Sequence, residues 1–146
     1  TPHIRAILDL GVPVGGGTDA TRVTSFNPWY SIQWMAPGLS RGGMRMYDDA
    51  NLLSREEALR VCTKGSAWFA GAADRKGAIA KGQMADFAVL DRDYFAVSDL
   101  EIANLKSDLT VLGGKVVYGA GPFETAALNH IPPVRPDWSP VILQAG

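Results

Sequence analysis

The chain has 146 residues, 47% of them hydrophobic, and a formal net charge of −1. This length suffices for one domain with its own core, and the scattered Lys and Arg residues argue against nucleic acid as a partner. No apolar run approaches the roughly 20 residues of a membrane span, and a single cysteine excludes an internal disulfide and a cysteine-rich metal cluster.

The first predicted elements are a helix over residues 1–11 and a strand over residues 12–17. Gly11 follows the helix, where a left-handed residue commonly ends one. The segment 12–17 carries no charge and no polar alternation, which is typical of a parallel strand that is covered on both faces. Because no partner strand precedes it, we expect the chain to be part of a larger architecture. The apolar helix residues at helical spacing are Ile4, Ile7 and Leu8.

Asp19 follows this strand and its glycine run, residues 15–17. A carboxylate just past the carboxyl end of an apolar strand lies where parallel α/β enzymes place their chemistry. A turn or helix-capping acid is an equal alternative from position alone. The glycine run does not predict a phosphate loop, since no Lys-Ser or Lys-Thr pair follows it.

A long connection, residues 18–53, comes next. Asn27-Pro28 can start a helix that runs to about residue 36, with Ile32, Met35 and Ala36 on one face, and Pro37-Gly38 ends it. Residues 40–49 have no periodicity and predict a surface loop, a kind of segment that is often functional beside a strand end. Three residues that follow Asp19 can shape a substrate pocket, with structural roles left equally open: Arg22, Asn27 and Trp29.

Ser54 and Glu57 have the spacing of a capping box, which predicts a helix or helix pair that ends near Gly71. Glu56 and Glu57 are therefore interpreted as helix-start acids and not as catalytic groups. Cys62 is interpreted as a small buried helix residue and not as a reactive thiol. The predicted apolar face consists of Ala58, Leu59, Cys62, Trp68 and Phe69.

The remaining sequence favours strands. Residues 77–79 and 86–91 are predicted as short strands with a turn at 81–82 between them. Residues 110–118 predict a hairpin, because the Gly113-Gly114 pair accepts the positive φ angles of a two-residue turn. Residues 121–146 hold five of the nine prolines and predict an extended tail on the surface.

Together, these motifs resemble the C-terminal part of the amidohydrolase superfamily, with amidohydrolase family 3, which includes N-substituted formamide deformylases, as the most similar branch. The resemblance implies a metal-dependent hydrolase built as a (β/α)8 TIM barrel with a small composite β-sandwich. It also implies one or two divalent metals, usually zinc. The segments that carry it are residues 17–20, 54–59, 77–91, 111–118 and 136–141.

The resemblance places the aspartate that follows the eighth barrel strand at Asp19, as metal ligand and as catalytic proton shuttle. Thr21 stands where the family usually has a proline. The family's His-x-His and its other ligands have no counterpart in the chain, and His3 and His130 are poor ligand candidates. Since one carboxylate cannot hold a catalytic zinc ion, we expect the isolated chain to be inactive.

The sequence thus predicts an α+β fragment: residues 1–75 as the end of the barrel, 76–120 as sandwich strands and 121–146 as the tail. The function expected of the parent is hydrolysis of a C–N bond in an amide, formamide or cyclic ureide; the alternative is a non-catalytic β-rich interaction or structural module. Expected partners are a small-molecule substrate, the remainder of the same enzyme and a homo-oligomer formed through the flank of strand 12–17, but neither nucleic acid nor membrane. The substrate, the metal and the compartment stay open, with the cytoplasm preferred.

Overall fold

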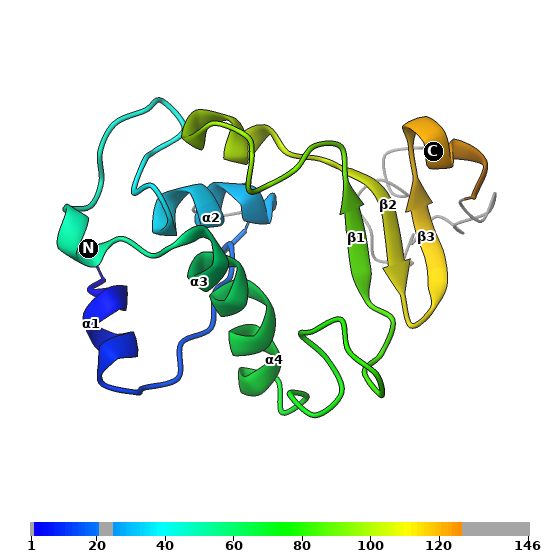
Figure 1. Ribbon diagram of the computed structural model, residues 1–146, viewed down its shortest axis with the longest axis horizontal. Helices are drawn as coiled ribbons and strands as arrows, with labels where there is room; N and C mark the ends of the chain where they lie inside the picture. Colours follow the sequence, from blue (N-terminus) through cyan, green and yellow to red (C-terminus); the bar gives the residue numbers. More distant parts are fainter. Residues whose placement is uncertain (1, 21–24, 127–146) are drawn as a thin grey trace, which may run out of the picture.

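The computed structural model describes residues 2–20 and 25–126. A group of short helices lies beside a three-stranded antiparallel sheet, as Figure 1 shows with the sheet on the right. The predicted α+β class is confirmed at this level. Within the described residues, no helix is both long and apolar enough to cross a membrane.

The first helix, α1 (Ile4–Asp9), ends as its sequence predicts. Gly11 adopts a φ of 72°, and its N–H donates to the carbonyl of Leu8 at 2.9 Å. The N–H of Val12 donates to the carbonyl of Ile7 at 3.2 Å. These two bonds form a Schellman motif, which satisfies carbonyls that a helix end otherwise leaves unpaired.

The predicted strand over residues 12–17 is wrong: the segment belongs to no strand. A parallel strand needs neighbouring strands, and the described residues place none beside it. Its backbone bonds to a helical region instead. The N–H of Gly16 donates to the carbonyl of Val61 at 3.1 Å, and the carbonyl of Gly16 accepts from the Ser66 hydroxyl at 2.7 Å.

The predicted helix after Asn27 is confirmed as α2 (Pro28–Met35). The Asn27 side chain caps it by accepting from the N–H of Trp29 at 3.0 Å, and proline suits the first helical position. Ile32, Met35 and Ala36 are buried, as the spacing predicts. The following loop contains an isolated bridge between Leu39 and Arg45 and a short 3₁₀ helix, η1 (Asp49–Asn51).

The predicted capping box is confirmed at the start of α3 (Arg55–Arg60). A π-helical turn, η2 (Val61–Gly65), and α4 (Ser66–Phe69) continue the helix to Gly71. The prediction that Trp68 and Phe69 belong to the buried face is wrong, because 54% and 62% of their surfaces are exposed. The π turn adds a residue to the helical repeat, so the regular spacing from Ala58 to Trp68 and Phe69 is broken, and Ala67 is the buried residue of α4.

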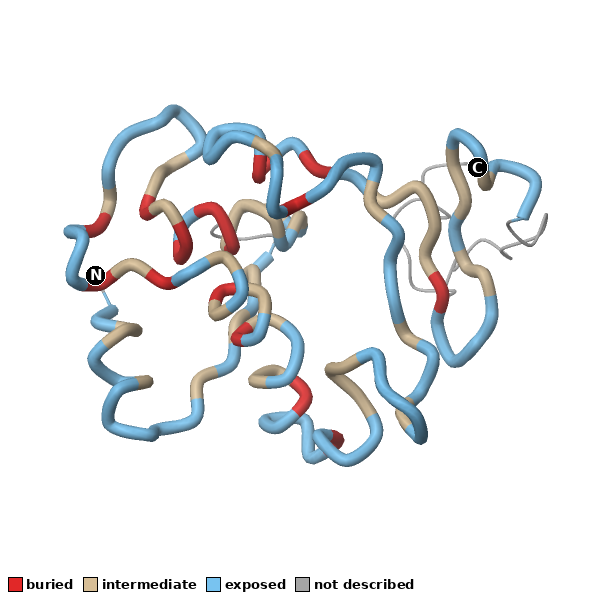
Figure 2. Tube along the Cα trace, viewed as in Figure 1, coloured by how far each residue is buried: buried red, intermediate tan, exposed pale blue. Residues whose placement is uncertain are grey.

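The hydrophobic core lies between α2, α3 and a later segment of the chain. Tyr94, Ile102 and Leu105, from residues 93–105, pack against these helices. Ile102 and Leu105 flank the end of a 3₁₀ helix, η3 (Asp99–Asn104), which contacts α2. Figure 2 shows the buried positions gathered in this helical part and largely missing from the strands.

The sheet consists of β1 (Phe87–Leu90), β2 (Ser107–Leu112) and β3 (Lys115–Gly119) in that order. The predicted hairpin between β2 and β3 is confirmed, since Gly113 and Gly114 adopt φ angles of 57° and 78°. These positive angles at both central positions match the favoured two-residue turn.

One further prediction in this part fails, and a second is tested only at its start. Residues 77–79 form no strand, because Gly77 adopts a φ of 89° against Ala67 and Lys64 of the helical region. Ile79, at the end of this segment, is 89% exposed. The tail predicted from residue 121 begins with a 3₁₀ helix, η4 (Gly121–Ala126), and residues 127–146 lie outside the described residues.

Candidate functional site

Asp19 borders a cavity of about 760 Å³. The glycine-containing segment 14–19 forms one side of the cavity, and α2 with the loop over residues 39–47 forms much of the rest. The structure therefore brings the residue that was singled out from the sequence to the edge of a half-open cavity large enough for a small molecule.

The backbone around Asp19 is held in an unusual conformation. Asp19 has a φ of 50°, and it is the only non-glycine residue with a positive φ in the described part of the chain. Aspartate tolerates this left-handed region better than most residues do. The N–H of Ala20 donates to the Thr18 hydroxyl at 3.3 Å, and the Ser31 hydroxyl of α2 donates to the carbonyl of Gly17 at 3.3 Å.

Two of the three glycines before Asp19 permit a close approach to the helical region. A Cβ atom at Gly15 would lie 2.7 Å from the Phe69 ring, and one at Gly16 would lie 2.8 Å from the Cys62 sulfur. A Cβ atom at Gly17 would meet nothing within 4 Å. Gly15 and Gly16 therefore allow the segment to lie directly against η2 and α4.

One wall of the cavity is apolar. Trp34 and Tyr47 pack with ring centroids 5.9 Å apart, and other apolar residues of this wall are Met35, Leu39 and Met46. Sequence reasoning missed this wall. Tyr30 and Trp34 lie four residues apart, one helical turn, so a second aromatic face was visible in the sequence beside the buried face of α2.

Arg41 is a charged residue that lines the cavity. Its guanidinium lies 5.1 Å from the centroid of the Tyr30 ring and also donates a hydrogen bond to the Tyr30 hydroxyl. Gln33 fixes the adjoining loop, since its side-chain amide donates to the carbonyl of Ser40 at 3.0 Å. The carbonyl oxygen Oε1 of the Gln33 side chain accepts from the N–H of Ala103 at 3.0 Å.

The described residues do not assemble a metal site. Across residues 2–20 and 25–126, no three His, Cys, Asp or Glu side chains lie close enough to hold a metal ion together. Asp19 supplies one carboxylate, whereas a zinc site takes about three protein ligands. His3 is the exposed residue before α1, and His130 lies outside the described residues.

Of the other three residues that the sequence offered for a substrate pocket, none in the described part of the chain lines this cavity. Arg22 lies outside the described residues. Asn27 caps α2, and its amide also donates to the carbonyl of Ala103 at 3.4 Å. Trp29 packs on Tyr94 with ring centroids 5.4 Å apart. Neither Asn27 nor Trp29 lines the cavity beside Asp19.

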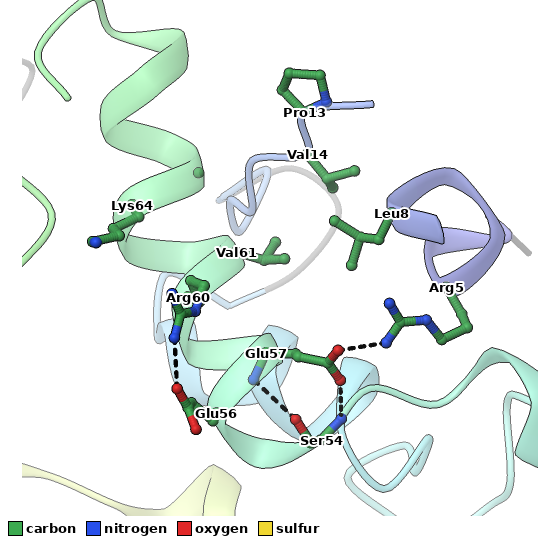
Figure 3. A pocket seen from close by; sticks show the side chains of 11 residues that line it. Arg5, Leu8, Pro13, Val14, Ser54, Glu56, Glu57, Arg60, Val61 and Lys64 are labelled. Atoms are coloured by element: carbon green, nitrogen blue, oxygen red, sulfur yellow. Dashed lines mark hydrogen bonds and ion pairs between the residues drawn. The ribbon is translucent and has the colours of Figure 1, made fainter. Parts of the chain in front are cut away.

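A second cavity, of about 720 Å³, lies between α1 and α3 (Figure 3). Its charged side chains are largely occupied with one another. The Glu57 carboxylate accepts hydrogen bonds from the Arg5 guanidinium at 2.6 Å and from the N–H of Ser54 at 2.8 Å. These bonds lower the pKa of Glu57 to about 2. Arg60 pairs with Glu56 at 2.6 Å. The acids predicted to start the helix therefore have structural partners.

Cys62 is half-buried, and desolvation raises the pKa of its thiol to about 11. A thiol with a raised pKa is a poor nucleophile at neutral pH, because the thiolate is the reactive form. This environment agrees with the predicted structural role of the residue.

Comparisons with known proteins give concordant matches. The model described as Amidohydrolase family matches residues 1–118. The protein named as amidohydrolase YtcJ of Bacillus subtilis (strain 168) is 30% identical over 116 residues, which are 78% of this chain and 22% of that protein. A 5-methylthioadenosine/S-adenosylhomocysteine deaminase of Bacillus cytotoxicus is 32% identical over 89 residues, which are 61% of this chain and 20% of that protein. The chain thus spans about a fifth of the length of the curated relatives it matches. No solved structure matches it.

Proposed function

We propose that this chain, which belongs to the amidohydrolase family, forms part of a longer enzyme that hydrolyses a C–N bond. The bond belongs to an amide, formamide or cyclic ureide, and N-substituted formamides are one class within this range. The proposed reaction is supported by the names of both relatives, one an amidohydrolase and the other a deaminase, since each name describes cleavage of a C–N bond.

The observation that carries this proposal is the position of Asp19 at the edge of a cavity of about 760 Å³. A carboxylate there can hold a water molecule by a hydrogen bond and accept its proton as the water oxygen attacks the substrate carbon. The carboxyl group can then return the proton to the nitrogen when the C–N bond breaks. The products from an amide are a carboxylic acid and an amine.

The geometry of segment 14–19 suits this role. Hydrogen bonds to Gly16 and Gly17 come from separate helical elements, so the backbone that leads to Asp19 is anchored on two sides. A catalytic carboxylate must keep its position relative to the bound substrate, because a small displacement lowers the rate strongly. The strained φ of Asp19 is also typical of functional positions.

Members of the amidohydrolase family generally use divalent metals. Asp19 alone does not fit a metal ion, so no catalytic step is assigned to one here. We propose that Asp19 contributes one ligand and that the other ligands come from the rest of the longer enzyme, with zinc as the expected metal.

A non-catalytic interaction or structural module is the second candidate. It is favoured by the exposure of large apolar side chains on the sheet, among them Phe87, Leu112 and Tyr118. A partner that covers these side chains would remove apolar surface from water. The module candidate assigns that cover to a second copy of the chain, whereas in the longer enzyme the remainder of the same protein supplies it.

The test is hydrolysis by the longer protein of a panel of amides, N-substituted formamides and cyclic ureides, with mass-spectrometric detection of the products. We expect at least one class to be cleaved with incorporation of one water, and a chelator to abolish the reaction. A folded protein that cleaves none of them would favour the interaction module.

A further inference from the structure

The cavity beside Asp19 contains two opposite charges that the described residues leave without ionic partners. Arg41 lines the cavity, as Asp19 does. Every ion pair of the described residues joins other side chains, so neither group has an ionic partner in residues 2–20 and 25–126. Because the Asp19 carboxylate is needed for proton transfer in the proposed function, Arg41 is the group that can recognise a charge on the substrate.

The Arg41 guanidinium is oriented before any ligand binds. It stacks on the face of Tyr30 and donates to the Tyr30 hydroxyl. The preceding residue, Ser40, is fixed through its carbonyl by the buried Gln33 side chain. An arginine held in one orientation loses less side-chain freedom on binding an oxyanion, which favours tight and geometrically selective recognition.

The rest of the cavity favours an apolar group. Trp34 is 40% exposed even though its ring packs on Tyr47. Leu39 and Met46 lie on the same cavity, and both come from the loop that carries Arg41. An unbranched or aromatic substituent seated on these side chains would remove their apolar surface from water, whereas a small polar acyl group would not.

We propose that the substrate of this site is an amide that carries both a large apolar group and a carboxylate. Arg41 binds the carboxylate, and the wall formed by Trp34, Leu39 and Met46 binds the apolar group. This inference rests on the proposed function for the reacting bond, and it adds Arg41 and Trp34 as residues that determine specificity.

The first test compares two amides that differ only in a carboxylate against a hydroxymethyl group. In the longer protein, Arg41→Gln should lower kcat/KM for the carboxylate substrate by roughly tenfold to a hundredfold, mostly through KM, because a charge-assisted hydrogen bond is lost. The hydroxymethyl substrate should change less than about threefold. Arg75→Gln, which alters an exposed arginine outside the cavity, should affect neither substrate. An equal loss for both substrates, or no loss, would overturn the role of Arg41.

The second test compares a phenyl-bearing amide with its methyl analogue. Trp34→Ala should reduce the preference for the phenyl substrate by about tenfold, since aromatic contact area is removed. Trp68→Ala is the matched control, because Trp68 is also exposed but lies outside the cavity. An unchanged preference in Trp34→Ala would contradict the proposed apolar subsite.

Binding without turnover separates this inference from the proposed function. Titration calorimetry of the longer protein with 4-phenylbutanoate and with 4-phenyl-1-butanol needs no hydrolysis. Tighter binding of the carboxylate, lost in Arg41→Gln, would support the subsite even if no amide is cleaved, in which case only the proposed function fails. Absence of binding, or binding that Arg41→Gln leaves intact, would overturn the subsite even in an active enzyme.

Discussion

The N–H of Gly16 donates to the carbonyl oxygen of Val61 at 3.1 Å. Val61 begins the π-helical turn, where its carbonyl also accepts from the N–H of Ser66, five residues on. The wider turn thus presents a carbonyl to a second chain segment. This contact anchors the glycine segment that leads to Asp19, so a local irregularity in one helix helps to position the candidate catalytic group.

Gly65 in the π turn is predicted to be intolerant of a side chain. A Cβ atom there would collide with the carbonyl oxygen of Val14, a backbone atom that cannot move freely. Gly65→Ala should therefore lower the free energy of unfolding by about 1–3 kcal/mol, although alanine is the better helix former. Denaturant unfolding measures this.

Gly17→Ala is the matched control for that substitution. A Cβ atom at Gly17 would meet nothing within 4 Å, and Gly17 does not adopt a positive φ. The variant should be neutral or slightly more stable, because alanine restricts the unfolded chain. Equal destabilisation by the two substitutions would contradict the close packing between segment 14–19 and η2.

The ion pair between Arg5 and Glu57 should make stability depend on acidic pH. The hydrogen bond from Arg5, with those from Ser54, lowers the pKa of Glu57 from 4.5 to about 2. A depressed carboxyl pKa adds stability above pH 4.5, and this contribution disappears as the pH falls towards 2. Because 39% of the Glu57 side chain is exposed, we expect a contribution of about 1 kcal/mol.

Thermal unfolding of Glu57→Gln and Glu57→Ala between pH 6 and pH 2 checks this dependence. Glutamine keeps a polar group for the capping box, so Glu57→Gln should lose mainly the pH dependence. Glu57→Ala should also lose about 1 kcal/mol at all pH values through the broken cap. A pH profile identical to that of the unmodified protein would contradict the assignment.

Cys62 should react slowly with thiol reagents in the folded protein. Burial raises the pKa of its thiol from 9.0 to about 11, so the thiolate fraction at pH 8 falls by about a hundredfold. Peptide mapping after timed iodoacetamide treatment measures modification at this residue alone, and urea should restore the normal rate. Rapid native modification would show that Cys62 is accessible and ionised.

Gln33 should be important for stability because its buried amide joins three parts of the chain. It is 1% exposed and connects α2 to Ser40 and to Ala103. Gln33→Leu would remove the partner of the buried N–H of Ala103 and that of the part-buried carbonyl of Ser40, which costs about 2–4 kcal/mol. Gln83→Leu, at a glutamine with one such bond, should cost below about 1 kcal/mol. Similar losses for both would contradict this role.

Local signals in the sequence predicted most of the short elements. The capping box at Ser54, the cap at Asn27 and the Gly113-Gly114 turn each involve residues close together in the chain, and the structure confirms all three. Such motifs depend on backbone geometry that neighbouring residues set.

Features that depend on distant contacts could not be predicted in the same way. Segment 12–17 has the composition of a buried strand but bonds to η2 and α4 instead of to other strands. The π turn bonds to the same segment through the carbonyl of Val61, and no local sequence pattern predicts this turn or the exposure of Trp68 after it. Only one of the two charged residues Asp19 and Arg41 of the cavity was predicted from the sequence. Asp19 was predicted from its position after the glycine run, whereas Arg41 lies in a loop without periodicity and was not predicted.

The central claim is that Asp19 transfers the proton in C–N bond hydrolysis. Asn tolerates the positive φ of this position as Asp does. Asp19→Asn therefore removes the carboxylate and keeps the backbone conformation. The decisive measurement is kcat/KM of the longer protein with Asp19→Asn, beside the exposed control Asp74→Asn. The account predicts a loss of at least about a hundredfold for the first variant and none for the second. Full activity in Asp19→Asn would contradict it.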